Sequence, residues 1–456
     1  MGSLTAGSAG SGGPIGGPLR VLPSNPRYFA DGFGRAVYLT GSHNWSNFKD
    51  MGLADPPTAF DYAAYLDFLV AHNHNFFRLW AWELTRSPHG RAKGVWYRAP
   101  FAWPRTGPGT ASDGKPKFDL SRFDQGYFDR MRSRIIAARD RGIYVSVMLF
   151  DGYGPQFNRV PGDGFPFDGE NNINGIACGG IELQALRDPA VTAVQETYVR
   201  KVIDTVNDLD NILYEVANEA GAYSTEWQYH IIEVVKQHQA QRPAQHPVGM
   251  TFQYEGGTNQ ALFDSPADWI SPAGPGYGHP SDPPVADGRK VIVNDTDHSL
   301  YYIGLLEAGE AGQRAWAWKN LLRGNSTLFM DPYLLPWSGR NEPHGAQVDP
   351  QWDTLRRNLG YTRSYAQRMN LTKAAPSEEI ASTRYCLAVP GEEYLVYLPD
   401  GGSITIDLSA AEGDLNVEWF DPTTGKTELA PRVAGGAKRD LAAPFEGDAV
   451  LFLCQS

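Results

Sequence analysis

Short apolar runs alternate with amphipathic helical stretches from about residue 20 to residue 372 of this 456-residue chain. This alternation is typical of parallel strands that are joined by helices. Eight strands with intervening helices predict a (β/α)8 barrel, and a doubly wound open sheet is the alternative. No Gly-rich phosphate loop follows the first strand, which disfavours a nucleotide-binding open sheet. The expected strands are Val37–Thr40, Phe76–Trp82, Ile143–Phe150, Ile212–Ala217, Val248–Phe252, Asp268–Ser271, Val291–Val293 and Ser326–Met330.

Helix signals separate these strands. Asp188 precedes Pro189, which is the pattern of an N-cap followed by proline at the first helical position. Residues 121–141 place apolar side chains on one face, and Gly142 follows as a stop signal. Two more helices are expected over residues 313–323 and from Trp352 onward.

The pattern changes at about residue 376, where short alternating strands follow one another between Gly, Pro and Asp turns. We therefore expect a flexible N-terminal segment (1–19), a catalytic barrel (20–374) and a small antiparallel β-sandwich domain (375–456). The N-terminus lacks the charged and apolar regions of a signal peptide. The compartment stays open: secreted or periplasmic if a signal peptide was removed, and otherwise cytoplasmic.

The composition limits the classes of molecule that the chain is expected to bind. The net charge is −12 and no basic run occurs, which argues against nucleic acid and anionic membranes as partners. No apolar stretch reaches the 18 residues that a membrane span needs. Aromatic residues make up 12% of the chain, which suits the stacking of rings on sugars. The composition does not indicate an oligomeric state.

Polar residues cluster where the expected strands end, which is where barrel enzymes place their chemistry. They are His43, Asn44, Arg78, Glu83, Asp151, Asn218, Glu219, Gln253, Asp295, Asp297, His298 and Asp331. Glycoside hydrolysis requires two carboxyl groups that flank the sugar. The fourth and seventh strands lie on opposite sides of an eight-stranded barrel, and both end here in carboxylates.

The segment Asn211–Glu219 resembles the fourth-strand Asn-Glu signature of the clan A glycoside hydrolases. The resemblance implies that Glu219 is the acid/base and that Asn218 binds the sugar 2-hydroxyl. It also implies that Arg78, on the second strand, keeps the nucleophile ionised. The sequence departs from the clan at the seventh strand, where the usual Glu is replaced by Asp295 or Asp297.

More widely, the chain is similar to the apiosidase-like barrel glycosidases, in which a β domain named as collagen-binding often follows the barrel. The stretch 25–32 resembles their N-terminal region, and residues 385–453 look like that β domain. The resemblance thus covers nearly everything after residue 20, and it implies a carbohydrate substrate.

The expected reaction is a retaining double displacement with Glu219 as acid/base and Asp295 or Asp297 as nucleophile. Because Asp is one methylene shorter than Glu, an inverting reaction through water and a non-catalytic carbohydrate-binding barrel remain alternatives. Glu215 is expected to support the site by pairing with Arg78. The expected substrate contacts are Asn218, Arg78, His43, Asn44, Trp45, Trp80, Trp82, Asp151, Gln253 and His298.

No cofactor is expected. Asp295, Asp297 and His298 resemble a set of metal ligands, but no second group with matching spacing accompanies them, so we expect no catalytic metal.

Overall fold

The computed structural model describes residues 15–88, 94–274, 282–299, 301–335 and 347–455. Its central element is a sheet of eight parallel strands in the order β4-β16-β15-β14-β13-β12-β11-β6. The strands are β4 (Thr40–His43), β6 (Phe76–Leu79), β11 (Tyr144–Asp151), β12 (Ile212–Asn218), β13 (Val248–Thr251), β14 (Trp269–Ser271), β15 (Val291–Asp295) and β16 (Ser326–Met330).

The two end strands of this order, β4 and β6, approach each other. The Thr40 amide donates to Asn75 Oδ1 at 2.9 Å, and the Asn75 amide donates to the Thr40 carbonyl at 3.0 Å. The sheet is therefore a nearly closed (β/α)8 barrel, which confirms the predicted fold class.

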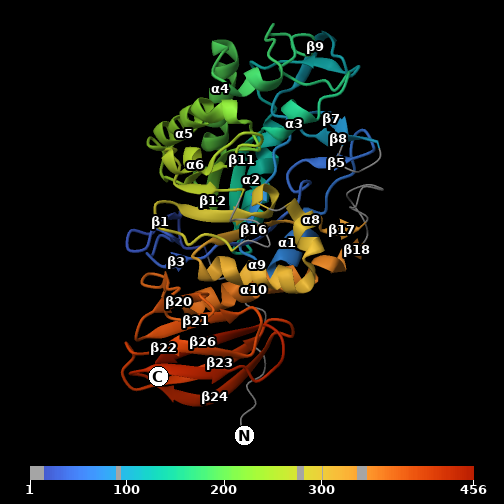
Figure 1. The fold of residues 1–456 in the computed structure, drawn as a ribbon. Coiled ribbons are helices and arrows are strands. Elements are labelled where there is room, and N and C mark those ends of the chain that lie inside the picture. The colour runs from blue at the N-terminus through green and yellow to red at the C-terminus, as the bar shows by residue number, and fades with distance from the viewer. Residues whose placement is uncertain (1–14, 89–93, 275–281, 300, 336–346, 456) are drawn as a thin grey trace.

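Helices surround the barrel (Figure 1). They are α1 (Tyr62–Ala71), α2 (Gln125–Arg139), α3 (Tyr153–Phe157), α4 (Pro189–Val206), α5 (Thr225–Gln239), α6 (Asn259–Asp264), α7 (Thr296–Ser299), α8 (Tyr301–Glu307), α9 (Gly309–Leu322) and α10 (Asp353–Arg368). Short 3-10 turns are η1 (Gly180–Gln184), η2 (Ala222–Ser224) and η3 (Pro350–Trp352). As predicted, Asp188 caps α4, because its side chain accepts from the Ala190 amide at 2.8 Å.

The prediction of the first barrel strand was wrong in position. Val37 belongs to a small antiparallel sheet formed by β1 (Arg20–Val21), β2 (Phe29–Ala30) and β3 (Ala36–Val37). The barrel strand begins only at Thr40, which pairs with Thr327 of β16. The two short strands are separated only by the buried Tyr38 and Leu39, so the sequence reads as one apolar run.

This small sheet closes the N-terminal end of the barrel. Leu19, Phe29 and Leu39 pack in one apolar cluster with Tyr144 and Leu213 of the barrel strands. Of the segment 1–19 that was expected to be flexible, residues 1–14 lie outside the described residues, and Leu19 is buried.

Further strands lie in the connections between barrel elements. They are β5 (Asp50–Gly52), β7 (Arg86–Pro88), β8 (Val95–Ala99), β9 (Arg105–Thr110), β10 (Pro116–Phe118), β17 (Leu334–Leu335) and β18 (Gln347–Val348).

The C-terminal region forms an antiparallel β domain with a core of its own, as predicted. One sheet has the order β19-β20-β21-β26-β23-β24, and β22 pairs with β25 in a second. Side chains from both sheets, including Ile404, Ile406, Trp419 and Leu451, share one apolar cluster. The strands are β19 (Ala375–Pro376), β20 (Cys386–Val389), β21 (Glu393–Leu398), β22 (Ser403–Asp407), β23 (Asp414–Asp421), β24 (Lys426–Ala434), β25 (Lys438–Ala442) and β26 (Ala449–Gln455).

The β domain packs on helices α9 and α10 of the barrel (Figure 1). Trp318 and Tyr365 of these helices contact Phe420, with ring centroids 5.7 and 5.3 Å away. Arg314 Nε donates to Asp448 Oδ1 at 2.8 Å beside this apolar contact. The β domain therefore lies against the barrel wall and not at the end of the barrel where the strands terminate.

Among the helices that the model describes, none combines the length and the apolar character that crossing a bilayer would demand.

Candidate active site

Glu219 directly follows β12 and is positioned by an unusual backbone conformation. Its φ is +52°, in the left-handed region that costs a non-glycine residue about 1–3 kcal/mol. Its carbonyl accepts from Gln156 Nε2 at 3.3 Å, and the Gly152 amide donates to the neighbouring Asn218 carbonyl at 2.8 Å. A Cβ on Gly152 would lie only 2.3 Å from the Ala220 nitrogen, so this close approach requires glycine. The loop after β11 thus fixes the backbone that carries Glu219.

Arg78 joins the second, fourth and seventh strands of the barrel inside the site. Its Nε donates to Glu215 Oε2 at 2.9 Å, and its Nη2 lies 2.8 Å from Asp295 Oδ2. All three side chains are fully buried, and Ser146 Oγ adds a bond to Glu215 at 2.9 Å. The expected pairing of Glu215 with Arg78 is therefore confirmed, and it orients the guanidinium toward Asp295.

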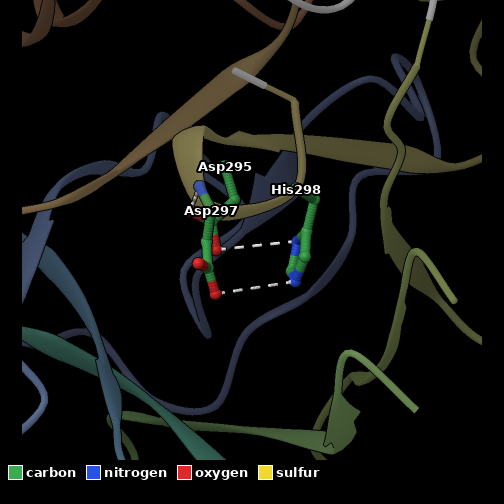
Figure 2. A group of neighbouring side chains, drawn as sticks. All are labelled: Asp295, Asp297 and His298. Carbon is green, nitrogen blue, oxygen red and sulfur yellow. Dashed lines mark hydrogen bonds and ion pairs between the residues drawn. The ribbon is translucent and has the colours of Figure 1, made fainter. Parts of the chain in front are cut away.

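Asp297 and His298 lie in α7, immediately after Asp295. Figure 2 shows both carboxylates beside the imidazole ring, with His298 Nδ1 3.8 Å from Asp295 Oδ2 and Nε2 4.0 Å from Asp297 Oδ2. The Asp297 amide donates to Asp295 Oδ1 at 2.9 Å. This bond ties the two aspartates together at the start of α7.

His298 holds Asn218 in one orientation. His298 Nε2 lies 2.8 Å from Asn218 Oδ1, and its Nδ1 lies 3.0 Å from Ser271 Oγ. Because the Asn218 oxygen can only accept, the imidazole proton is on Nε2, and Nδ1 accepts from the serine. Burial lowers the pKa of His298 to about 3, which keeps the ring neutral.

The three carboxyl groups near the strand ends have different electrostatic environments. Burial raises the pKa of Glu219 well above its usual range, and the charges of Asp297 and Asp151 raise it further. Burial and the charge of Asp295 raise the pKa of Asp297 to about 7. For Asp295, burial is outweighed by Arg78 and His43, which lower its pKa below its usual range. The surroundings therefore favour the ionised form of Asp295 and the protonated form of Glu219.

We expect the variant Asp297→Asn to move the basic limb of the kcat/KM profile to lower pH. An acid catalyst acts only while it is protonated. The charge of Asp297 raises the pKa of Glu219, so its removal should lower that pKa. The measurement is kcat/KM against pH for both proteins. An unchanged basic limb, or one shifted to higher pH, would contradict this coupling.

His43 lies against Asp295 and against the aromatic residues that follow the second strand, β6. Its Nε2 is 3.6 Å from Asp295 Oδ1, and its ring stacks on Trp80 with centroids 5.3 Å apart. Trp80 and Trp82 are only 2% and 4% exposed. Protein atoms cover their faces, so these two rings pack beneath the site and are not available to a sugar. Trp45, which contacts both rings, is half-buried.

Three other expected contact residues use their side chains to hold loops. Asn44 Nδ2 donates to the Pro332 carbonyl at 3.2 Å, and its Oδ1 accepts from the Ser46 amide at 2.8 Å. Gln253 Nε2 donates to the Gly221 carbonyl at 3.1 Å. Asp151 Oδ1 accepts from the Gly154 amide at 3.0 Å. Asp151 also acts on Glu219, because its charge raises the pKa of that carboxyl.

Asp331 follows the end of β16, but its carboxylate is engaged by an ion pair with Arg356 and does not join the other carboxyl groups of the site. Arg356 of α10 donates to both of its carboxylate oxygens, at 2.6 and 2.8 Å, and both side chains are fully buried. This bidentate pair attaches β16 to α10.

Asp295, Asp297 and His298 each place one potential ligand atom within 4.8 Å of the others, which is compatible with a metal site. Their chemistry disfavours a metal. Arg78 already supplies a cation at 2.8 Å from Asp295, and both His298 nitrogens are engaged by Asn218 and Ser271. A metal would have to displace these partners.

Several residues of the site were not predicted from the sequence. Ser146 and Ser271 contact it from the third and sixth strands, and their place as polar residues within buried strands was the available signal. Gln156 and Tyr254 reach Glu219 or its loop from neighbouring connections, which no local pattern indicates.

The comparisons with known proteins agree with this architecture. Residues 375–453 match the family model described as "Putative collagen-binding domain of a collagenase". No curated protein matches the chain in sequence.

Solved structures resemble the whole chain. A glycoside hydrolase family 5 protein from Bacteroides vulgatus superposes with a TM-score of 0.66 at 14% identity, over 97% of this chain and 93% of that one. A "putative glycoside hydrolase" from the same organism gives 0.63 at 14% identity, over 99% and 84%. The chain therefore has the barrel fold found in family 5 glycoside hydrolases, followed by a β domain that matches the collagen-binding family model.

Proposed function

We propose that the chain is a glycoside hydrolase that cleaves O-glycosidic bonds of a poly- or oligosaccharide with retention of configuration. The main supporting observation is the contact of 2.8 Å between Arg78 and the buried Asp295, whose strand is separated by two others from the strand that Glu219 follows. Retaining hydrolysis needs one ionised and one protonated carboxyl group on either side of the sugar. The arginine supplies the first condition, and the buried surroundings of Glu219 supply the second.

In the proposed reaction, a sugar lies between the two strand ends. Glu219 donates its proton to the departing glycosidic oxygen while an Asp295 oxygen bonds to C1. Water then attacks C1 while Glu219 removes a proton from that water, and the bond between C1 and the Asp295 oxygen breaks, which frees the sugar and restores both carboxyl groups. Asn218, fixed by His298, is positioned to bind a sugar hydroxyl.

Asp297 is the second candidate for the partner of Glu219. Its Oδ2 makes no hydrogen bond among the described residues, and its charge acts on Glu219 more strongly than that of Asp295 does. An Asp297 that activated water would make the enzyme inverting. We favour Asp295 because its pKa is lowered, whereas that of Asp297 is raised to about 7.

A panel of nitrophenyl pentosides and hexosides tests this function, with the first-formed anomer identified by NMR. We expect hydrolysis of at least one glycoside, with the product anomer matching the substrate. Inversion would instead support the water route through Asp297. Binding without hydrolysis of any glycoside would indicate a non-catalytic carbohydrate-binding barrel.

A further inference from the structure

Three aromatic rings form a cluster next to Glu219 that the proposed reaction does not use. Tyr153 and Phe157 lie in α3, after β11, and Tyr254 follows β13. The Phe157 centroid lies 5.4 Å from that of Tyr153 and 5.1 Å from that of Tyr254. Phe157 and Tyr254 are 39% and 40% exposed. These two neighbouring rings therefore present apolar surface to solvent that a ligand ring could cover.

The topology places this cluster around the acid/base. In the sheet, β12 lies between β11 and β13, so rings from the two flanking loops meet beside the end of β12. Tyr254 forms a parallel bridge with Gly221, two residues after Glu219. From the other side, Gln156 of α3 donates to the Glu219 carbonyl at 3.3 Å. Consistent with this proximity, the pKa of Tyr153 is raised first by burial and then by the Glu219 charge.

The position of Asp295 indicates which part of the substrate lies beside the aromatic cluster. β15 is separated from β12 by β13 and β14, so a sugar can lie between Asp295 and Glu219. Because Glu219 protonates the glycosidic oxygen in the proposed reaction, the bond that breaks faces Glu219. The group that leaves lies beyond Glu219, on the side of the aromatic cluster. Trp80 stacks on His43, which lies beside Asp295, and Trp82 packs on Trp80. Both tryptophans are covered by protein and do not present a face to a ligand.

We propose that Phe157 and Tyr254 form the leaving-group subsite and stack on the apolar face of a ring, such as the next sugar of an oligosaccharide. This inference rests on the proposed function and deepens it. A flat ring presents C–H groups to an aromatic face, which favours its binding over that of a small alcohol. The enzyme would then select substrates by a ring on the leaving side of the bond.

The experiment measures binding by calorimetry in the Glu219→Gln background, where turnover is suppressed. The probes are the phenyl and methyl glycosides of the sugars that the nitrophenyl panel covers. Both probes place the same sugar next to Asp295, but only the phenyl glycoside places a ring against the cluster. We expect Phe157→Ala and Tyr254→Ala to weaken binding of the phenyl glycoside about three- to tenfold. Binding of the methyl glycoside should weaken less than about twofold.

Two further variants test whether the ring itself is responsible. Phe157→Tyr keeps an aromatic face and should bind the phenyl glycoside like the parent. Phe33→Ala removes an aromatic residue that is 76% exposed on the turn between β2 and β3, and it should change neither affinity.

The outcomes separate this inference from the proposed function. Equal losses for both probes, or no loss for either, would overturn the leaving-group subsite and leave the hydrolase intact. If no glycoside binds to the parent protein, the proposed function fails and the subsite fails with it.

Discussion

The variant Asp295→Asn is expected to lower kcat/KM by about 10⁴-fold, which corresponds to roughly 5 kcal/mol of transition-state stabilisation. Asparagine has nearly the same shape but no negative charge, so it cannot form the covalent ester with C1. Arg78 keeps its bond to Glu215 at 2.9 Å, so the guanidinium should remain in place. The measurement is the hydrolysis of an activated aryl glycoside, with the thermal midpoint recorded to confirm folding.

Asp297→Asn is the matched control, because it makes the same replacement of a carboxylate by an amide two residues further along the chain. It should retain far more activity and change mainly the pH profile. Azide can replace a missing carboxylate, so adding it to Asp295→Asn should restore turnover and give a glycosyl azide. Restoration in Asp297→Asn instead would identify Asp297 as the nucleophile and refute the assignment of Asp295.

The activity that the variant Glu219→Gln loses should depend on the leaving group of the substrate. For sugars and other poor leaving groups, loss of the acid should lower turnover about 10²- to 10⁴-fold. For dinitrophenyl glycosides, the leaving group departs without a proton, so formation of the glycosyl-enzyme should be nearly unaffected. The measurement is kcat/KM for a series of aryl glycosides whose phenols differ in pKa.

A control for this series is Glu226→Gln, which changes an exposed glutamate at the start of α5, shortly after Glu219 in the chain. It should behave as the wild type with every substrate. Equal losses for good and poor leaving groups in Glu219→Gln would mean that Glu219 is not the proton donor.

The barrel could be predicted from the sequence because its strands are continuously buried. β12 and β16 contain only buried residues and appear as apolar runs bounded by polar ones. The Arg78–Glu215 pair could also be anticipated, since both are charged residues within buried strands. Such residues need an opposite charge nearby.

The rest of the site depends on contacts between distant segments. Trp80 and Trp82 lie at a strand end and were expected to contact sugar, yet His43 and other side chains cover them. Conversely, the exposed ring of Tyr254 meets Phe157 across a gap of nearly a hundred positions in the chain. Periodicity reports which face of an element is buried, but it does not report which loops converge at a strand end.

Trapping of the glycosyl-enzyme tests the central claim most directly. A 2-deoxy-2-fluoro glycoside with a good leaving group should react with the protein, and the labelled peptide can be located by mass spectrometry. The proposed mechanism predicts one sugar per chain, attached to Asp295, and no label in the Asp295→Asn variant. A label on Asp297, or no covalent adduct from a glycoside whose parent sugar is hydrolysed, would contradict it.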